Sequence, residues 1–263
     1  MTDLLTIQGQ ADVRGSRVLS QLISDGVCRS AWHADRALST NTTALDQIHK
    51  GELLPTDCPR VFLADIQTAG RGRHGRQWIS ETDNLAVSMV VDAGEVASPS
   101  AKLLPISVGV AIAQAIEHQI APMRVQLKWP NDIWLNNSKL AGILIERSSV
   151  APELAVVGMG INVGSAPEQA VSLMSATGRP IDKLEVLESI IIQVSDIMKS
   201  HDDHVINEFR SRCLLTRKRI TFQYHGMDRS GECLGIDEHG RMNVQTEDGM
   251  TTIESGEVSL VRF

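Results

Sequence analysis

A single loop rich in glycine and arginine constrains this sequence more than any other feature. Residues 70–78 read Gly-Arg-Gly-Arg-His-Gly-Arg-Gln-Trp, so three arginines alternate with three glycines. The loop follows an apolar run at residues 61–64, which predicts a buried strand. Backbone N–H groups of such a loop, together with guanidinium groups, bind carboxylate or phosphate oxygens. We therefore expect an anion site, in a loop that is mobile when empty and closes over its ligand as a lid.

The same letters satisfy the Gly-x-Gly-x-x-Gly fingerprint of dinucleotide-binding folds, with Asp92 at a suitable distance downstream. Residues 76–84 show no apolar periodicity at helical spacing, so the fingerprint lacks the helix whose N-terminus would bind pyrophosphate. RNA-binding Arg-Gly segments are the other alternative, but they occur as repeated, disordered tracts. This loop is single and lies between predicted strands, so the sequence disfavours both alternatives.

Charge and cysteine content narrow the class of protein. The chain has 263 residues and a net charge of −7, which argues against non-specific DNA or RNA binding and against a basic membrane-surface patch. No secretory signal and no membrane-length apolar stretch are visible, so we expect a cytoplasmic protein. Residues 201–204, His-Asp-Asp-His, fit solvated surface better than a metal site. We expect four reduced, mostly buried thiols at Cys28, Cys58, Cys213 and Cys233.

Apolar spacing predicts alternating strands and helices up to residue 214. The predicted strands are residues 32–34, 61–66, 85–91, 125–129, 133–135, 140–145 and 154–163, and the predicted helices are residues 18–23, 44–48, 103–116, 187–198 and 205–214. Short alternating strands follow at 220–224, 231–236, 242–246, 251–254 and 258–261. This change predicts two domains, residues 1–214 and 215–263, the second a small antiparallel barrel without room for a large ligand pocket.

Polar residues collect at the ends of the predicted strands. Residues 128–132, Lys-Trp-Pro-Asn-Asp, end one strand, and Lys139 begins an apolar strand across a predicted hairpin. A buried lysine needs a partner, which is either an ion pair with Asp132 or Glu146 or an anionic substrate. Residues 39–41, Ser-Thr-Asn, fit a helix N-cap and also a ligand contact. Three of the four tryptophans lie nearby, as core residues or as walls around a heterocycle: Trp78, Trp129 and Trp134.

In order and spacing, these pieces resemble the biotin protein ligases (biotin–acetyl-CoA-carboxylase ligases). The resemblance rests on the blocks Gly-Arg-Gly-Arg-x-Gly-Arg-x-Trp, Lys-Trp-Pro-Asn-Asp and Lys-Leu-x-Gly-Ile-Leu-x-Glu, at residues 70–78, 128–132 and 139–146, and extends over about residues 30–263. It implies an α+β fold, in which a class II synthetase-like mixed sheet with flanking helices precedes a small SH3-like barrel. Only about 30 residues precede this region, so we expect no winged-helix domain and no operator binding.

The resemblance also implies a two-step reaction that uses ATP. Biotin and ATP give biotinyl-5′-AMP and pyrophosphate, and the biotinyl group then passes to a lysine of a biotin carboxyl carrier protein domain. ATP with Mg²⁺ and biotin are therefore expected as substrates, without a permanently bound cofactor, and neither DNA nor a membrane is an expected partner. The oligomeric state stays open, a homodimer included. The alternatives are a lipoate or octanoate ligase or transferase of the same fold, and a non-catalytic biotin sensor.

The family's site residues carry over to matching positions of this sequence. The implied catalytic residues are Lys139, Arg73 and Asp132, with Asp132 also the candidate magnesium ligand. The implied biotin-binding residues are Ser39, Thr40, Asn41, Gln67, Gly70, Arg71, Gly72, Arg73, Lys139 and Gly142. The implied ATP-binding residues are Arg73, Arg76, Trp78, Lys128, Asn131, Lys139 and Asn162. Physical reasoning agrees, because each contact between like charges at 4 Å costs about 4 kcal/mol at an effective dielectric of 20, so two acids meet only among cations.

Overall fold

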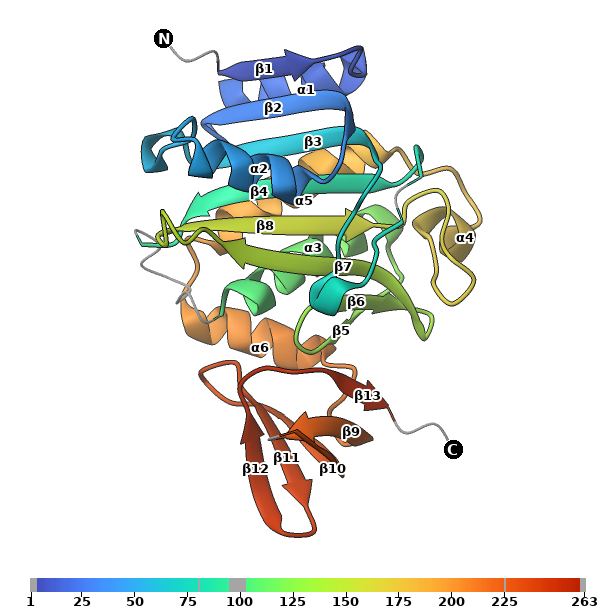
Figure 1. The fold of residues 1–263 in the computed structure, drawn as a ribbon. Helices are drawn as coiled ribbons and strands as arrows, with labels where there is room; N and C mark the ends of the chain where they lie inside the picture. The colour runs from blue at the N-terminus through green and yellow to red at the C-terminus, as the bar shows by residue number, and fades with distance from the viewer. Residues whose placement is uncertain (1–3, 80, 95–102, 225, 261–263) are drawn as a thin grey trace.

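A large mixed sheet forms the centre of the N-terminal part of the chain. The computed structural model describes residues 4–79, 81–94, 103–224 and 226–260. Eight strands form a mixed sheet in the order β1-β2-β3-β4-β8-β7-β6-β5 (Figure 1). The strands are β1 (Leu5–Gln8), β2 (Ser30–Ala37), β3 (Arg60–Gln67), β4 (Leu85–Asp92), β5 (Gln126–Lys128), β6 (Asp132–Leu135), β7 (Ser138–Arg147) and β8 (Leu154–Ile161). The pairs β1–β2 and β2–β3 are parallel and the others are antiparallel, as the predicted α+β fold requires.

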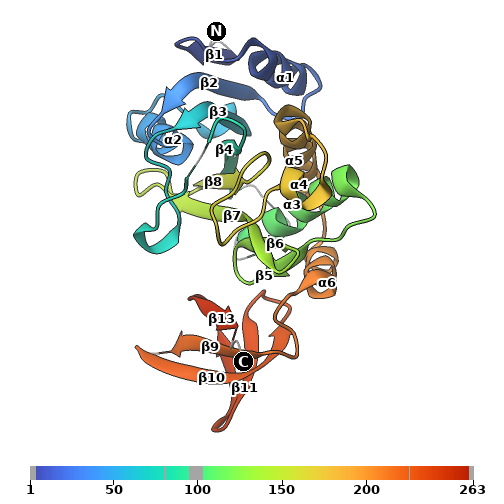
Figure 2. The ribbon, with the colours of Figure 1, turned by 90° about the vertical axis from the view of Figure 1, so that its right-hand side faces the viewer.

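Helices lie on both faces of this sheet. The helices α1 (Val13–Ser24), α3 (Leu104–Ile120) and α5 (Lys183–Ile197) cover one face, and α2 (Thr40–His49) packs on the other against β3, β4 and β8 (Figure 2). The short α4 (Leu173–Thr177) and then α6 (Asp202–Arg212) complete this part of the chain. The first turn of α2 therefore faces the middle of the sheet, next to the glycines of β8.

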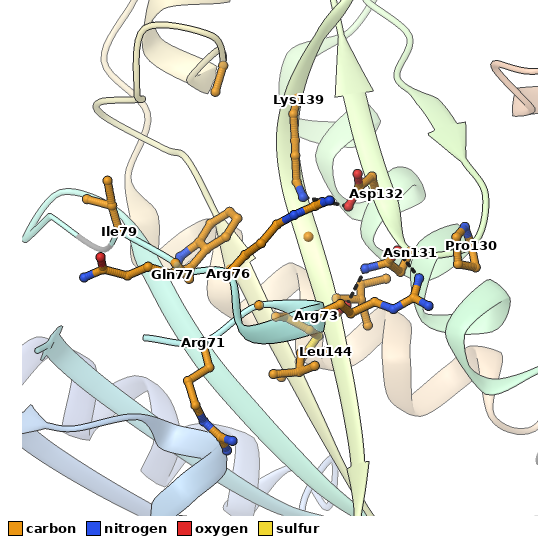
Figure 3. A pocket seen from close by; sticks show the side chains of 18 of the residues that line it. Arg71, Arg73, Arg76, Gln77, Ile79, Pro130, Asn131, Asp132, Lys139 and Leu144 are labelled. Carbon is orange, nitrogen blue, oxygen red and sulfur yellow. Dashed lines mark hydrogen bonds and ion pairs between the residues drawn. The ribbon is translucent and has the colours of Figure 1, made fainter. Parts of the chain in front are cut away.

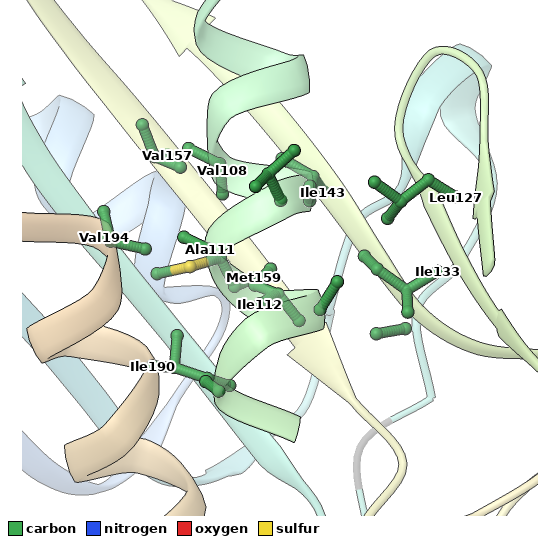
Figure 4. Close-up of a cluster of buried hydrophobic side chains, with 14 of the residues drawn as sticks. Val108, Ala111, Ile112, Leu127, Ile133, Ile143, Val157, Met159, Ile190 and Val194 are labelled. Carbon is green, nitrogen blue, oxygen red and sulfur yellow. The ribbon is translucent and has the colours of Figure 1, made fainter. Parts of the chain in front are cut away.

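The main core lies between α3 and the sheet. Helix α3 is apolar on nearly every face, and Val108 and Ile112 are fully buried. They pack with Ile143 of β7 and Met159 of β8, while Ile190 of α5 closes the cluster from the other side (Figure 4). Burial of such a side chain contributes about 1.5–3 kcal/mol. The strands that carry the polar motifs are thus held on a rigid support.

The C-terminal strands form a second, separate sheet. The strands β9 (Arg219–Tyr224), β10 (Met227–Ile236), β11 (Met242–Thr246), β12 (Gly249–Ile253) and β13 (Val258–Leu260) pair antiparallel in the order β12-β11-β10-β9-β13. The described strands β12 and β13 lie at opposite edges and do not pair, so the predicted barrel is not closed within them. One reason is the shortness of β13, whose predicted last residue, at position 261, lies outside the described residues. The arrangement is consistent with an SH3-like domain.

Most predicted elements are confirmed, including the hairpin of β6 and β7. Its turn residues Asn136 and Asn137 have φ values of 49° and 61°, the left-handed region that asparagine tolerates. Strand β1 and helix α4 were not predicted, because both are too short to show a period. All four cysteines carry free thiols and only Cys213 is not buried, as predicted. Within the described residues, no helix has both the length and the apolar character needed to cross a membrane.

Candidate active site

A pocket of about 420 Å³ lies between α2, the β5–β6 turn and the loop at residues 70–78, which we call the arginine loop. The strands β7 and β8 form its floor, and the loop lies over them (Figure 3). All predicted site residues except Gly70 line this pocket. A Cβ atom on Gly70 would lie 2.4 Å from the Trp78 carbonyl oxygen, so this glycine allows the two ends of the loop to approach each other.

One end of the pocket is neutral and consists of Ser39, Thr40, Asn41 and Gln67, which we call the neutral end. The first three are each only 3% exposed, at the start of α2. Ser39 takes the N-cap position without a side-chain cap hydrogen bond, so the capping interpretation holds for its position and not for its hydroxyl. The Thr40 backbone N–H donates to Gln67 Oε1 at 2.8 Å, which links α2 to the end of β3. The neutral end is thus assembled from two elements, the start of α2 and the end of β3.

Two glycines of β8 make room for side chains of the pocket, as their position in a predicted strand suggested. A Cβ atom on Gly158 would lie 2.3 Å from Asn41 Oδ1, and a Cβ atom on Gly160 would lie 2.3 Å from the Trp78 indole. Real Cβ contacts are never that short, so any larger residue must displace these side chains. Gly158 therefore serves the neutral end and Gly160 serves the wall formed by Trp78.

The three arginines of the loop have three different partners. Arg71 forms an ion pair with Glu146 of β7 at 2.9 Å, and Arg73 Nη1 donates to Asn131 Oδ1 at 3.0 Å. Arg76 forms an ion pair with Glu257, which follows β12 in the C-terminal sheet. Figure 3 shows Arg71 pointing away from Arg73 and Arg76. This separation reduces the repulsion between the guanidinium groups.

No helix follows the arginine loop in the described residues before β4, only a 3-10 turn at Arg73–Gly75. The dinucleotide-binding interpretation is therefore excluded on structural grounds, as the missing apolar periodicity indicated.

Two lysines complete the cationic end of the pocket. Lys139 Nζ lies 2.7 Å from Asp132 Oδ1 and 5.9 Å from the centroid of the Trp78 ring. The predicted ion pair of Lys139 is thus with Asp132, while Glu146 pairs with the arginine loop. Burial lowers the pKa of Lys128, whose ammonium lies 5.3 Å from the Trp134 ring centroid. Five cationic side chains and two carboxylates, Asp132 and Glu257, line this pocket.

The C-terminal sheet contributes to the pocket, which the sequence analysis missed. Residues 256–259, immediately before and within β13, line it beside the arginine loop. The small domain was predicted to be too small for a large pocket of its own, and here it supplies one edge segment to a pocket built mainly by the other sheet. The sequence feature that could have indicated this contact was the carboxylate of Glu257, just before the last predicted strand. The boundary near residue 214 stays a prediction.

Asp132 and Glu257 are the carboxylates that line the pocket. In the described part of the chain, no group of three or more His, Cys, Asp or Glu side chains is arranged to hold a metal ion, the segment 201–204 included. Mg²⁺ commonly uses only one or two carboxylates together with substrate phosphates. The single carboxylate of Asp132 beside a cationic pocket fits a magnesium ion that arrives with a polyphosphate.

A pocket of this kind can bind a neutral ring at one end and two anionic groups at the other.

Comparisons with known proteins agree with this interpretation of the pocket. The model of the biotin/lipoate A/B protein ligase family matches residues 33–162, and that of the biotin protein ligase C terminal domain matches residues 218–261. The biotin–[acetyl-CoA-carboxylase] ligase of Mycobacterium tuberculosis is 31% identical over 100% of both chains.

Similar structures include the biotin protein ligase of Aquifex aeolicus in complex with biotin and ATP. It superposes with a TM-score of 0.76 at 28% identity and covers 89% of this chain and 99% of its own. The bifunctional ligase/repressor BirA of Bacillus subtilis is 29% identical over 80% of this chain and 69% of its own length. The full-length identity and the matched C-terminal domain favour biotin ligases over the lipoate branch. The chain therefore belongs to the biotin protein ligases, within the biotin/lipoate A/B protein ligase family.

Proposed function

We propose that this protein is an ATP-dependent biotin protein ligase. An oxygen of the biotin carboxylate attacks the α-phosphorus of ATP, pyrophosphate leaves, and biotinyl-5′-AMP forms. A lysine amine of a carrier domain then attacks the acyl carbon, loses a proton and displaces AMP. The observation that carries the proposal is one pocket in which a neutral, buried end adjoins an end lined by five cationic side chains.

The neutral end is assigned to the ureido ring of biotin. Ser39, Thr40 and Gln67 offer hydroxyl and amide groups that match the donors and the acceptor of a cyclic urea. Gly142 and Gly72 also line the pocket. A neutral ring requires no counter-ion, which agrees with an end that lacks charged lining residues.

The cationic end is assigned to the carboxylate and the phosphates. Lys139 would bridge the biotin carboxylate and the α-phosphate and stabilise charge on the pentacoordinate transition state. Arg71 and Arg73 would hold the carboxylate side, and Arg76, Lys128 and Asn131 the phosphate side. Positioning of the two acids contributes a further part of the rate, roughly 7–11 kcal/mol in well-oriented reactions. The walls formed by Trp78 and Asn162 would exclude water from the acyl-adenylate.

The second step needs a group near the incoming amine. Asp132 faces the pocket and lies beside Lys139, so its carboxylate can orient the acceptor lysine or accept its proton. Asp132 also supplies one oxygen ligand for a magnesium ion bound with ATP. We place the reaction in the cytoplasm, with the carrier domain of a biotin-dependent carboxylase as the protein substrate, and leave a homodimer as an alternative to a monomer.

An assay of pyrophosphate release tests the proposal directly. The full-length protein is supplied with ATP, Mg²⁺ and either biotin, lipoate or octanoate. We expect release with biotin only, followed by transfer to a carrier domain. Release with lipoate or octanoate would support the alternative ligases instead. A protein that binds biotin without any release would be a sensor.

A further inference from the structure

A buried serine behind the neutral end has no role in the site described so far. Ser88 of β4 is 0% exposed and does not line the pocket. Its Oγ lies 2.6 Å from Thr40 Oγ1 and 2.6 Å from Asn41 Oδ1. A serine hydroxyl has one hydrogen and cannot donate to both. The direction of each bond must therefore be worked out from the neighbouring groups.

The orientation of the Asn41 amide follows from its other partners. Asn41 Nδ2 donates to Glu146 Oε2 at 2.8 Å and to the Leu144 carbonyl at 3.2 Å. Both partners are acceptors, because a backbone carbonyl has no hydrogen to donate and Glu146 Oε2 also accepts from Arg71. A flipped amide would set oxygen against oxygen twice. Asn41 Oδ1 must therefore face Ser88, and it can only accept.

These constraints fix the direction of each hydroxyl hydrogen bond in turn. Ser88 donates its hydrogen to Asn41 Oδ1, since otherwise two lone pairs would meet at 2.6 Å. The contact between Ser88 and Thr40 then requires Thr40 to donate to Ser88. Gln67 Oε1, at 3.1 Å from Thr40 Oγ1, is the more distant partner and already accepts the Thr40 backbone N–H. With its one hydrogen donated, Thr40 Oγ1 can only accept a hydrogen bond from a group in the pocket.

We infer that Ser88 and Glu146 are positioning residues that give Thr40 a fixed hydrogen-bond polarity, so that the neutral end accepts a ring N–H and rejects a ring oxygen. This inference rests on the proposed function, because it names the specificity of the same site. Asn41 acts here as the link between the two positioning residues. Both of its amide hydrogens are donated within the protein, to Leu144 and Glu146, and its Oδ1 accepts from Ser88.

The test uses biotin and two cyclic carbamate analogues, each with one ring N–H replaced by oxygen. Their dissociation constants are measured by calorimetry on the full chain, and their KM and kcat by pyrophosphate release. Wild-type protein should bind one carbamate about tenfold or more weakly than biotin, the loss typical of a hydrogen bond replaced by facing lone pairs. In Ser88→Ala the dissociation constant of that carbamate should exceed that of biotin only about twofold. The reason is that the freed Thr40 hydroxyl can turn and donate to the ring oxygen. Biotin itself should bind several-fold more weakly, with the KM for ATP unchanged.

Control variants separate polarity from packing. Ser107→Ala removes another fully buried serine hydroxyl, on α3 and outside the pocket, and should leave both ratios unchanged. Thr40→Ser should keep the preference for biotin over the carbamate, and Thr40→Val should lose it. This pair tests the hydrogen-bond polarity of Thr40 even where Ser88→Ala does not fold. Glu146→Gln should give an intermediate ratio, because the new amide can donate to a flipped Asn41.

Failure of this inference is distinct from failure of the proposed function. If Ser88→Ala or Thr40→Val still binds biotin in preference to the carbamate as strongly as wild-type protein does, and biotin-dependent pyrophosphate release is intact, only the inferred positioning role of Ser88 and Glu146 is overturned. Wild-type protein that binds biotin without releasing pyrophosphate overturns the ligase proposal, while the calorimetric ratio still decides that positioning role. Wild-type protein that binds neither biotin nor the carbamates overturns both.

Discussion

The neutral end and the cationic end of the pocket differ in where their polar groups find partners. At the neutral end, Thr40 and Asn41 are buried and bonded to one another through Ser88. At the cationic end, Lys139, Arg71 and Arg76 are partly exposed and paired with the carboxylates of Asp132, Glu146 and Glu257. A neutral ligand group thus meets polar groups that are bonded to one another, whereas an anionic group meets cations that already have carboxylate partners. Exposed pairs of this kind contribute only about 0–1 kcal/mol, so exchanging them for ligand contacts is inexpensive.

The largest effect should come from Lys139, the cation proposed to contact both the biotin carboxylate and the α-phosphate. Lys139→Ala should lower kcat for adenylation by about 10²–10³, the usual loss when one preorganised electrostatic contact is removed. Pyrophosphate release measures this, with circular dichroism and thermal unfolding as controls for the fold. If Lys139→Ala and Asp132→Asn both lose cooperative folding, the ion pair is mainly structural and the contrast between the two ends fails.

Arg73→Ala should have the next largest effect. Its guanidinium donates to Asn131 and lines the pocket, at the end that we propose binds the carboxylate and the phosphates. Loss of a charge-assisted hydrogen bond is worth about 1.5–3 kcal/mol, or roughly 10–150-fold in kcat/KM. Steady-state kinetics with biotin and ATP varied separately measure it. An unchanged kcat/KM for both substrates would remove Arg73 from the site, and Arg73→Lys should recover only part of the activity because it lacks the planar fork.

A matched pair of glycine variants compares the two ends directly. Gly158→Ala places a Cβ atom 2.3 Å from Asn41 Oδ1, and Gly160→Ala places one 2.3 Å from the Trp78 ring. Overpacking of this kind costs about 1–3 kcal/mol. We expect Gly158→Ala to raise the KM for biotin about tenfold and Gly160→Ala to act mainly on ATP. Equal effects of both variants on both substrates would mean that the two ends do not act separately.

The smallest effect concerns pH. Burial lowers the pKa of Lys128 below its usual 10.5. Affinity for ATP, followed by titration calorimetry, should therefore weaken as pH rises through that lowered pKa, and Lys128→Arg should move the decline to higher pH. Folding stability should change in the opposite sense, because the unfolded chain keeps the proton up to pH 10.5 and the folded chain releases it earlier. A decline that Lys128→Arg does not move would assign it to another group.

Much of this architecture could be predicted from local pattern. Strands such as β3 and β4 are continuous apolar runs, and α3 and α5 keep helical spacing, so period alone located them. The arginine loop was identified because alternating glycine and arginine residues are typical of an anion-binding loop and of few other structures. Strand β1 was missed since its four residues alternate too briefly, and its place at the edge depends on pairing with β2.

The sequence by itself determined which kinds of side chain the site holds, and its motifs placed the family. Only the tertiary structure decided the partners: Glu146 with Arg71, Asp132 with Lys139, and Glu257 of the second sheet with Arg76. The reason is that hydrogen bonds and ion pairs act over about 3 Å between residues up to 181 positions apart, as for Arg76 and Glu257. Local periodicity carries no information over that separation, so Ser88, an ordinary strand residue in the sequence, became part of the site only when β4 was packed against α2.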